Sequence, residues 1–236
     1  MGKGRLLSKE FLPNFHDKEG FLEKITDEKN ITRKIGNQLV LVNILALLYG
    51  VVMGCYNGLY QALSSAIKMP VLFSLLIIIC FPAFYVIQSV LGSRLSLAQM
   101  VSIILSGFVY TTSIMVSFST IVLFFLITGG NYAFIQLLHV AVIALSGIFG
   151  MKHIIDALKY SCEKKNIYPK TGIAVFRFWI VIMFFVGSQL SWSLRPFIGT
   201  KDNPFELFRK QEGNFYQALI HSFADLFDPR GKQKGS

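Results

Sequence analysis

Long apolar stretches separated by short polar ones dominate the chain. No Asp, Glu, Lys or Arg occurs at residues 35–67, 69–93 or 95–151. A helix needs about 20 predominantly apolar residues to cross the hydrocarbon core of a bilayer. We therefore predict five membrane-spanning helices, at residues 37–66, 70–91, 97–128, 132–151 and 172–194. Pro70 is expected in the first turn of the second helix, a position that proline tolerates.

This pattern predicts an all-α protein, a polytopic membrane helix bundle of about five transmembrane helices with amphipathic segments at both ends. In the C-terminal region, apolar residues recur with helical spacing from Phe215 to Phe227, which predicts an amphipathic helix. The predicted regions are a cytoplasmic charged and amphipathic segment at 1–36, a five-span transmembrane domain at 37–195, C-terminal amphipathic helices at 196–228 and a disordered tail at 229–236.

Composition and charge favour the same class of protein. Hydrophobic residues make up 53% of the 236 residues and charged residues only 15%, whereas a soluble domain carries about 25% charge. The net charge of +10 comes from basic residues that flank the apolar stretches, where lipid headgroups lie. We therefore expect no nucleic-acid partner. Three cysteines are too few for a disulfide framework.

Lys and Arg are unevenly divided between the two sides of the predicted membrane domain. The N-terminal segment, the loop after the second helix and the region after the fourth helix share one side and hold eight, one and six of them. The opposite side holds eight in total. Because loops rich in Lys and Arg stay in the cytoplasm, we predict a cytoplasmic N-terminus and a C-terminus on the other side.

Small residues recur every fourth position in the first predicted helix. This spacing leaves one helix face almost without side chains, so that a neighbouring backbone can approach closely. The neighbour can be another helix of the same chain, which is the commoner arrangement, or the same helix of a second copy. The predicted helix-packing residues are Ala46, Gly50, Gly54, Gly58, Ala62 and Ala66.

Hydroxyl side chains in the third predicted helix fall within about 60° of one another at 100° per residue. Such a stripe can line a watery path, although such hydroxyls more often bond carbonyls of their own helix and pack against a neighbour. Two amides of the first helix, one turn apart, are further candidates. The candidate polar path comprises Asn57, Gln61, Ser102, Ser106, Ser113, Ser117, Thr120 and His139.

His139 is the one histidine well inside a predicted span, and an ionisable group there is a functional candidate. It has no second His, Asp or Glu one turn away, so we predict no metal site. A neutral imidazole bonded to a hydroxyl or carbonyl is the favoured interpretation. At the end of the fifth helix, Trp192 and Arg195 are the candidates for anchoring the tail. Trp192 suits the aromatic belt, and Arg195 lies near Asp202 and Glu206 in the sequence, with which it can fasten the tail to the bundle.

Five segments of the chain form a recognisable set: Gln61–Pro70, Leu91–Ser96, Gly187–Gly199, Pro204–Arg209 and Gly213–Tyr216. They resemble a group of uncharacterised polytopic bacterial membrane proteins. The overall layout is also similar to that of Yip1-like proteins. The resemblance covers most of residues 40–220 and implies the bacterial inner membrane, but it implies no activity and no functional residues.

The sequence contains no hydrolase, metalloprotease, nucleotide-binding or potassium-filter motif. We therefore expect a non-enzymatic integral membrane protein without a cofactor. The small-residue ladder, together with two amphipathic ends that need partners, favours a function through assembly in the lipid bilayer, as a homo-oligomer or as a subunit of a membrane complex. The alternative is an ion or small-solute channel or transporter, with a polar path lined by the first and third helices.

Overall fold

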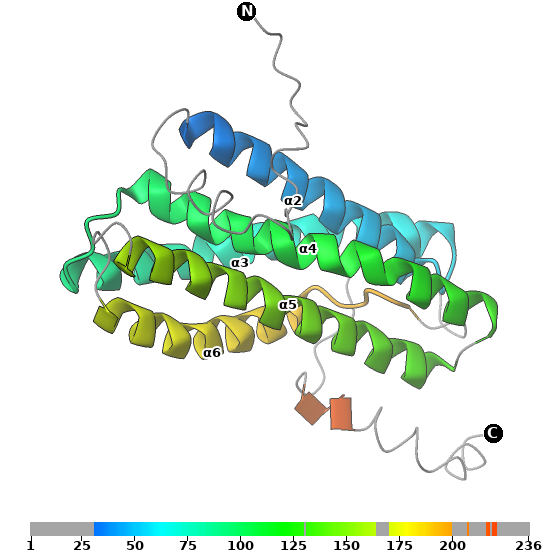
Figure 1. Cartoon of the computed structure of the whole chain (residues 1–236). Coiled ribbons are helices and arrows are strands. Elements are labelled where there is room, and N and C mark those ends of the chain that lie inside the picture. Colours follow the sequence, from blue (N-terminus) through cyan, green and yellow to red (C-terminus); the bar gives the residue numbers. More distant parts are fainter. Residues whose placement is uncertain are drawn as a thin grey trace, which may run out of the picture.

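The computed structural model describes residues 31–129, 131–163, 170–199, 207, 216, 217, 219 and 220. Within them the chain forms five long helices and no strand (Figure 1). Each helix is long and apolar enough to cross a membrane, so the predicted all-α membrane bundle is confirmed. The helices are α2 (Ile31–Gly54), α3 (Leu59–Val90), α4 (Leu97–Ile127), α5 (Tyr132–Glu163) and α6 (Lys170–Ser193).

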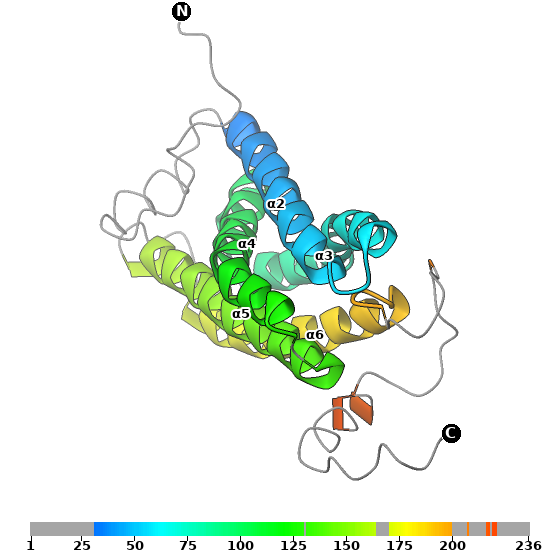
Figure 2. The ribbon, with the colours of Figure 1, turned by 90° about the vertical axis from the view of Figure 1, so that its right-hand side faces the viewer.

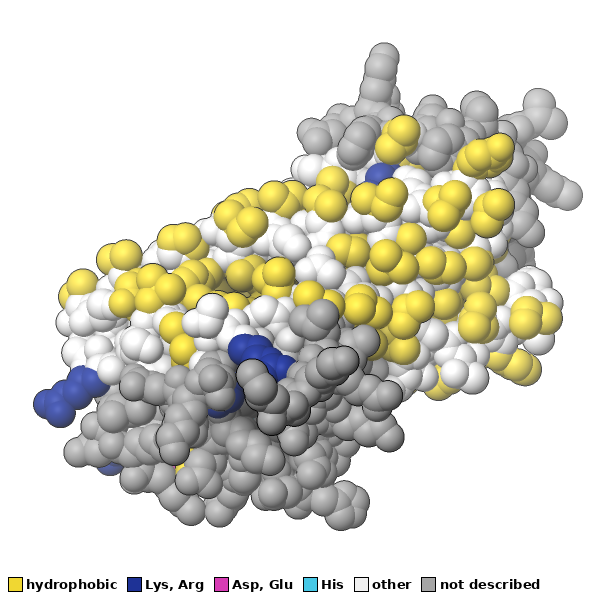
Figure 3. Space-filling model, turned by 90° about the horizontal axis from the view of Figure 1, so that it is seen from above, with side chains coloured by type: hydrophobic (Ala, Val, Ile, Leu, Met, Phe, Trp, Pro, Cys, Tyr) yellow, Lys and Arg dark blue, Asp and Glu magenta, His cyan; other side chains and the backbone are white. Residues whose placement is uncertain are grey.

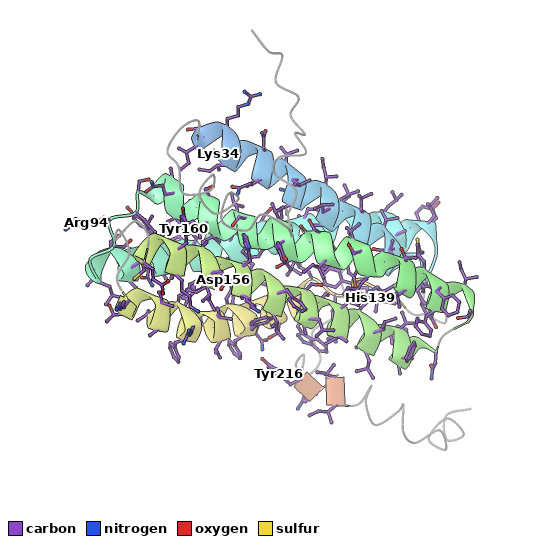
Figure 4. All side chains as sticks on the ribbon, viewed as in Figure 1. Lys34, Arg94, His139, Asp156, Tyr160 and Tyr216 are labelled. Atoms are coloured by element: carbon purple, nitrogen blue, oxygen red, sulfur yellow. The ribbon has the colours of Figure 1, made fainter. Side chains whose placement is uncertain are left out.

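Consecutive helices run in opposite directions along the bundle (Figures 1 and 2). Helix α2 packs against α3 and α4, and α4 packs against α5, whereas α6 touches α3 and α5 more sparsely. Lys34 and Arg94 lie toward the end of the bundle where α2 begins, and His139 lies in the other half (Figure 4). The turn near Thr128 and the end of α5 therefore lie at opposite ends, as five alternating spans require.

The prediction of one continuous helix over residues 37–66 is wrong. Helix α2 ends at Gly54, and α3 begins at Leu59 after a turn that contains Gly58 with φ +108°. Asn-Gly is a turn dipeptide, and Asn57-Gly58 lies in the middle of the small-residue ladder. Pro70 consequently lies inside α3 instead of in its first turn.

Six helix boundaries lie within two residues of the prediction, and two others extend further into polar sequence. Helix α4 starts with a capping box, in which Oε1 of Gln99 accepts from the backbone N–H of Ser96 at 2.9 Å and Oγ of Ser96 accepts from the backbone N–H of Gln99 at 3.3 Å. Helix α5 continues to Glu163, beyond the predicted apolar span. At the N-terminal end, residues 31–36, predicted to belong to the charged segment, already form the start of α2.

The outer surface of the described bundle is strongly apolar. Large hydrophobic side chains are exposed on every helix, including Leu47, Ile78, Phe124, Phe149 and Phe185. In Figure 3 such side chains cover much of the face seen from above. Soluble proteins bury side chains of this kind, so this surface fits contact with the lipid bilayer.

The chain leaves the helical conformation after Ser193. Residues 196–199, at the start of the predicted C-terminal region, are non-helical, and Phe197 and Ile198 are buried in the core. Proline at position 196 cannot continue the hydrogen-bond pattern of α6, and Gly199 has φ +67°. The rest of the predicted C-terminal helices, apart from a few residues, and residues 1–30 and 229–236 lie outside the described residues.

Candidate functional site

The small-residue ladder forms a contact between α2 and α3 of the same chain. A Cβ atom on Gly54 would lie 2.5 Å from Cα of Ala62, and one on Gly50 would lie 2.9 Å from Cα of Ala66. The chain reverses direction at the turn that contains Gly58, so Gly50 and Gly54 of α2 face Ala66 and Ala62 of α3. The ladder therefore brings two backbones together within one chain and does not lie on one face of a single helix.

A second close contact between backbones joins α4 and α5 and was not predicted. A Cβ atom on Gly150 would lie 2.7 Å from the carbonyl oxygen of Gly107 and would overlap the side chain of Thr111. Glycine at both positions lets the two helices approach closely. The pairing of Gly107 with Gly150 spans two separate helices, and no repeat in the sequence marks it.

The predicted polar path along residues 37–66 and α4 is not assembled in the described structure. Ser102 is fully buried and donates to Oε1 of Gln38 at 3.2 Å, which ties α4 to α2. Ser106, Ser113 and Ser117 donate to carbonyl oxygens of α4 itself at 2.6, 2.7 and 3.0 Å. Ser117 and Thr120 are exposed on the outer surface. The stripe thus serves packing and the helix backbone.

The polar residues near the start of α3 hold the segment that follows α6. Gln61 is buried and donates to the carbonyl oxygens of Pro196 and Phe197 at 2.9 and 3.1 Å. Ser65 donates to the carbonyl oxygen of Phe197 as well. Lys68, 5% exposed, donates to the carbonyl oxygens of Pro196 at 3.0 Å and of Leu207. These bonds fix the buried turn over residues 196–198 inside the bundle.

The helices predicted at residues 37–66 and 70–91 leave Lys68 in the loop between them, where it is one of the eight Lys and Arg counted on the side opposite the N-terminus. Its position inside α3 makes it a buried cation among carbonyl oxygens. The signal in the sequence was its isolation, because Lys68 is the one charged residue between Lys34 and Arg94. An isolated charge in an apolar stretch is a functional candidate.

A cavity of about 500 Å³ lies between the helices and the turn over residues 196–198. This volume is within the range of small-molecule pockets. All five described helices contribute to its wall. The wall is mainly apolar, and methionine, leucine and phenylalanine are its commonest residues. The lining residues include Met53, Met69, Leu72, Phe73, Leu76, Phe108, Thr111, Tyr132, Gln136, His139, Ala144, Gly147, Met151, Met183, Phe184, Gly187, Ser188, Ser191, Trp192, Arg195 and Leu219.

His139 is the candidate polar-path residue that lines this cavity. It is fully buried on α5 (Figure 4), and its Nδ1 atom lies 2.9 Å from the hydroxyl of Tyr49 on α2. The two rings meet edge to face, with centroids 5.6 Å apart. Nε2 of His139 is buried without a hydrogen-bond partner among the described residues. Tyr49 had not been predicted as part of any site.

Trp192 and Arg195, the predicted tail anchors, both line the cavity. The guanidinium carbon of Arg195 lies 3.6 Å from the centre of the Trp192 ring, a cation–π contact. Described residues of the tail are fastened elsewhere, since the hydroxyls of Tyr216 and Ser188 are 3.2 Å apart beside α6 (Figure 4). Asp202 and Glu206, the expected partners of Arg195, lie outside the described residues.

The chemistry available at the cavity is that of binding. Among the residues that the structure describes, no three His, Cys, Asp or Glu side chains lie close enough together to hold a metal ion. The described lining contains no acidic residue. The wall therefore offers apolar contact, a few neutral polar groups and the guanidinium of Arg195.

The chain matches no protein-family model, and no similar protein was found among curated proteins or among solved structures. The geometry described above is therefore the basis on which a function is assigned.

Proposed function

We propose that this multi-pass membrane protein binds a small lipophilic molecule inside its helix bundle, in the cavity beside His139. The observation that carries the proposal is a cavity of about 500 Å³ with a largely apolar wall and one fully buried histidine. Binding sites for small molecules combine an apolar wall with a few placed polar groups. A lipid-soluble ligand reaches such a site from the bilayer that surrounds the protein.

The role is one of binding and not of catalysis. The sequence contains no catalytic motif, and general acid–base chemistry needs a positioned proton donor and acceptor around the substrate. The location proposed is the bacterial inner membrane with the N-terminus in the cytoplasm. The support for this orientation is the excess of Lys and Arg on the side where α2 begins.

The two functions predicted from the sequence lose their main support. A channel required the hydroxyl stripe of α4. Ser102 bonds Gln38, whereas Ser106, Ser113 and Ser117 bond carbonyl oxygens of their own helix, and the stripe reaches the outer surface at Ser117 and Thr120. Assembly was predicted from the small-residue ladder, both sides of which belong to one chain. An oligomer would need another surface, and native mass spectrometry in mild detergent measures whether one forms.

The experiment compares two substitutions on α5 that add the same side chain in different places. Ala144 lines the cavity, whereas Ala141, three residues earlier, is exposed on the outer surface. The probe is 1-bromodecane, whose heavy atom quenches the fluorescence of a neighbouring tryptophan, here Trp192 in the cavity wall. Trp179 is replaced by Phe in every sample, so that Trp192 is the sole tryptophan.

Saturable quenching is expected in the reference protein and after Ala141→Phe. After Ala144→Phe, the apparent affinity for 1-bromodecane should fall at least about tenfold, because a phenyl ring occupies the site. Equal quenching by the three proteins, without saturation, would mean that the probe dissolves in the detergent around the helices. That result would refute the proposal.

A further inference from the structure

The pair formed by Tyr49 and His139 leaves one buried polar atom without a partner among the described residues, on a residue that lines an apolar cavity. Both side chains are fully buried, and their single hydrogen bond joins the tyrosine hydroxyl to Nδ1 at 2.9 Å. Nε2, the other ring nitrogen, has no hydrogen-bond partner among the described residues. His139 lines the cavity and its Nε2 atom is enclosed, so a ligand would supply that partner after a small shift of the ring or of the side chains around it.

The hydrogen bond to Tyr49 decides which kind of partner fits. If the hydroxyl donates to Nδ1, the imidazole proton is on Nε2, and one group of the pair, Nε2–H, is left without a partner. If Nδ1–H donates instead, both the tyrosine proton and the bare Nε2 are left unsatisfied. Because each buried unsatisfied group costs free energy, the first arrangement is favoured, and Nε2 is a hydrogen-bond donor.

An acceptor that suits this site carries no charge. The described wall holds one charged group, the guanidinium of Arg195, which stacks on the ring of Trp192. A carboxylate or phosphate bonded to His139 instead would be a charge in a mainly apolar part of the wall, which is costly. A carbonyl oxygen accepts a hydrogen bond and remains neutral. The rest of the ligand is apolar, to match residues such as Leu72, Phe108 and Met151.

We infer that the cavity binds a lipid-soluble molecule through a neutral carbonyl oxygen, to which His139 donates a hydrogen bond from Nε2. This inference rests on the proposed function and adds the chemical class of the ligand. Two kinds of membrane molecule share this chemistry, lipophilic quinones and the acyl esters of lipids. The experiment therefore has one arm for each.

Each arm compares a carbonyl compound with a hydrocarbon of the same shape. A decyl-substituted 1,4-benzoquinone is paired with decylbenzene, and methyl laurate is paired with tridecane. Affinity for the intact purified protein is measured by equilibrium dialysis in one detergent. We expect at least one carbonyl compound to bind about tenfold more tightly than its hydrocarbon, the gain of one net hydrogen bond, and the arm with the larger ratio identifies the source.

Two substitutions test the role of His139 in this preference. His139→Phe keeps an aromatic ring and removes the donor, so the tenfold preference for the carbonyl compound should vanish while the hydrocarbon still binds. His139→Gln supplies an amide N–H donor near the position of Nε2 and should restore part of the preference. Melting temperature and elution volume show whether each variant is folded.

A spectroscopic measurement on the unmutated protein makes the test independent of folding variants. A hydrogen bond weakens the C=O bond, so the infrared stretch of the bound ligand should shift to lower frequency than in hexane. Equal affinity for carbonyl compounds and hydrocarbons, with an unshifted stretch, would overturn the inference and leave the proposed function intact. If no apolar probe binds, the proposed function falls as well.

Discussion

Two regions of the bundle pack their helices in opposite ways. One is the close contact between α2 and α3, and the other is the open region between α3, α5 and α6. At the first, glycine and alanine face each other, and a Cβ atom on Gly54 would lie 2.5 Å from Cα of Ala62. At the second, large flexible side chains such as Met69, Met183 and Phe184 surround about 500 Å³ of space. Both regions use apolar residues, and one is closed whereas the other is hollow.

The difference follows from side-chain size at facing positions. Small residues on both helices let the backbones meet, and van der Waals contact holds them there without a hydrophobic driving force. Long side chains hold α6 away from its neighbours, and the turn over residues 196–198 fills part of the gap. Close backbone contacts thus hold α2 against α3 and α4 against α5, whereas α6 packs more loosely and forms one wall of the cavity.

The most damaging change should be Gly54→Leu, which places a side chain against the backbone of Ala62. Overpacking that cannot be relieved costs about 3 kcal/mol or more, so we expect loss of the folded protein in chemical unfolding monitored in detergent. Gly36→Leu on the same helix is the control, because nothing lies within 4 Å of a Cβ atom there. If Gly54→Leu instead leaves stability unchanged and lowers the native mass, the contact lies between chains.

Lys68→Met should release the turn that closes the cavity. The substitution removes the bonds from the ammonium group to the carbonyl oxygens of Pro196 and Leu207. Bonds from a charged donor contribute about 2 kcal/mol, and we expect faster hydrogen exchange at the amides of Phe197 and Ile198. Lys152→Met, at an exposed position on α5, should leave those rates unchanged. Equal rates in both variants would show that the turn does not depend on Lys68.

Gly187→Ala should stabilise α6 slightly, because this wall of the cavity has room. A Cβ atom there would meet only Leu76, at 3.6 Å, which is ordinary contact. Alanine in place of glycine in a helix contributes about 0.5–1 kcal/mol, seen as a higher melting temperature. Gly147→Ala should gain less, because its Cβ atom would come within 3.1 Å of Phe184. A loss of stability in Gly187→Ala would mean that this wall has no room for a methyl group.

Ser117→Leu should have almost no effect, within about 0.5 kcal/mol. Ser117 is exposed and bonds only the carbonyl oxygen of Ser113 in its own helix. Ser102→Leu, four turns earlier in the same stripe, should destabilise the protein, because Gln38 would lose its buried partner. Comparable losses in both variants would place the whole stripe in the interior and would restore the path along α4.

Several elements could be predicted from the sequence because lipid imposes a simple rule on each segment. A segment that crosses the bilayer must be helical and apolar for about 20 residues. Helices α4 and α6 are accordingly predicted to within two residues at each end. The error at α2 and α3 arose because Asn57-Gly58 fits both a four-residue repeat and a turn, and hydropathy does not distinguish them.

The sequence by itself determined the class of protein, since the absence of charge over long stretches leaves no folded alternative outside a membrane. It also determined that small residues would let two backbones touch. Only the tertiary structure decided that both backbones belong to one chain, that Tyr49 meets His139 across 90 positions of sequence, and that Lys68 reaches the turn after α6. Such partners depend on which helix faces come together, and a periodic pattern along one helix does not specify its neighbour.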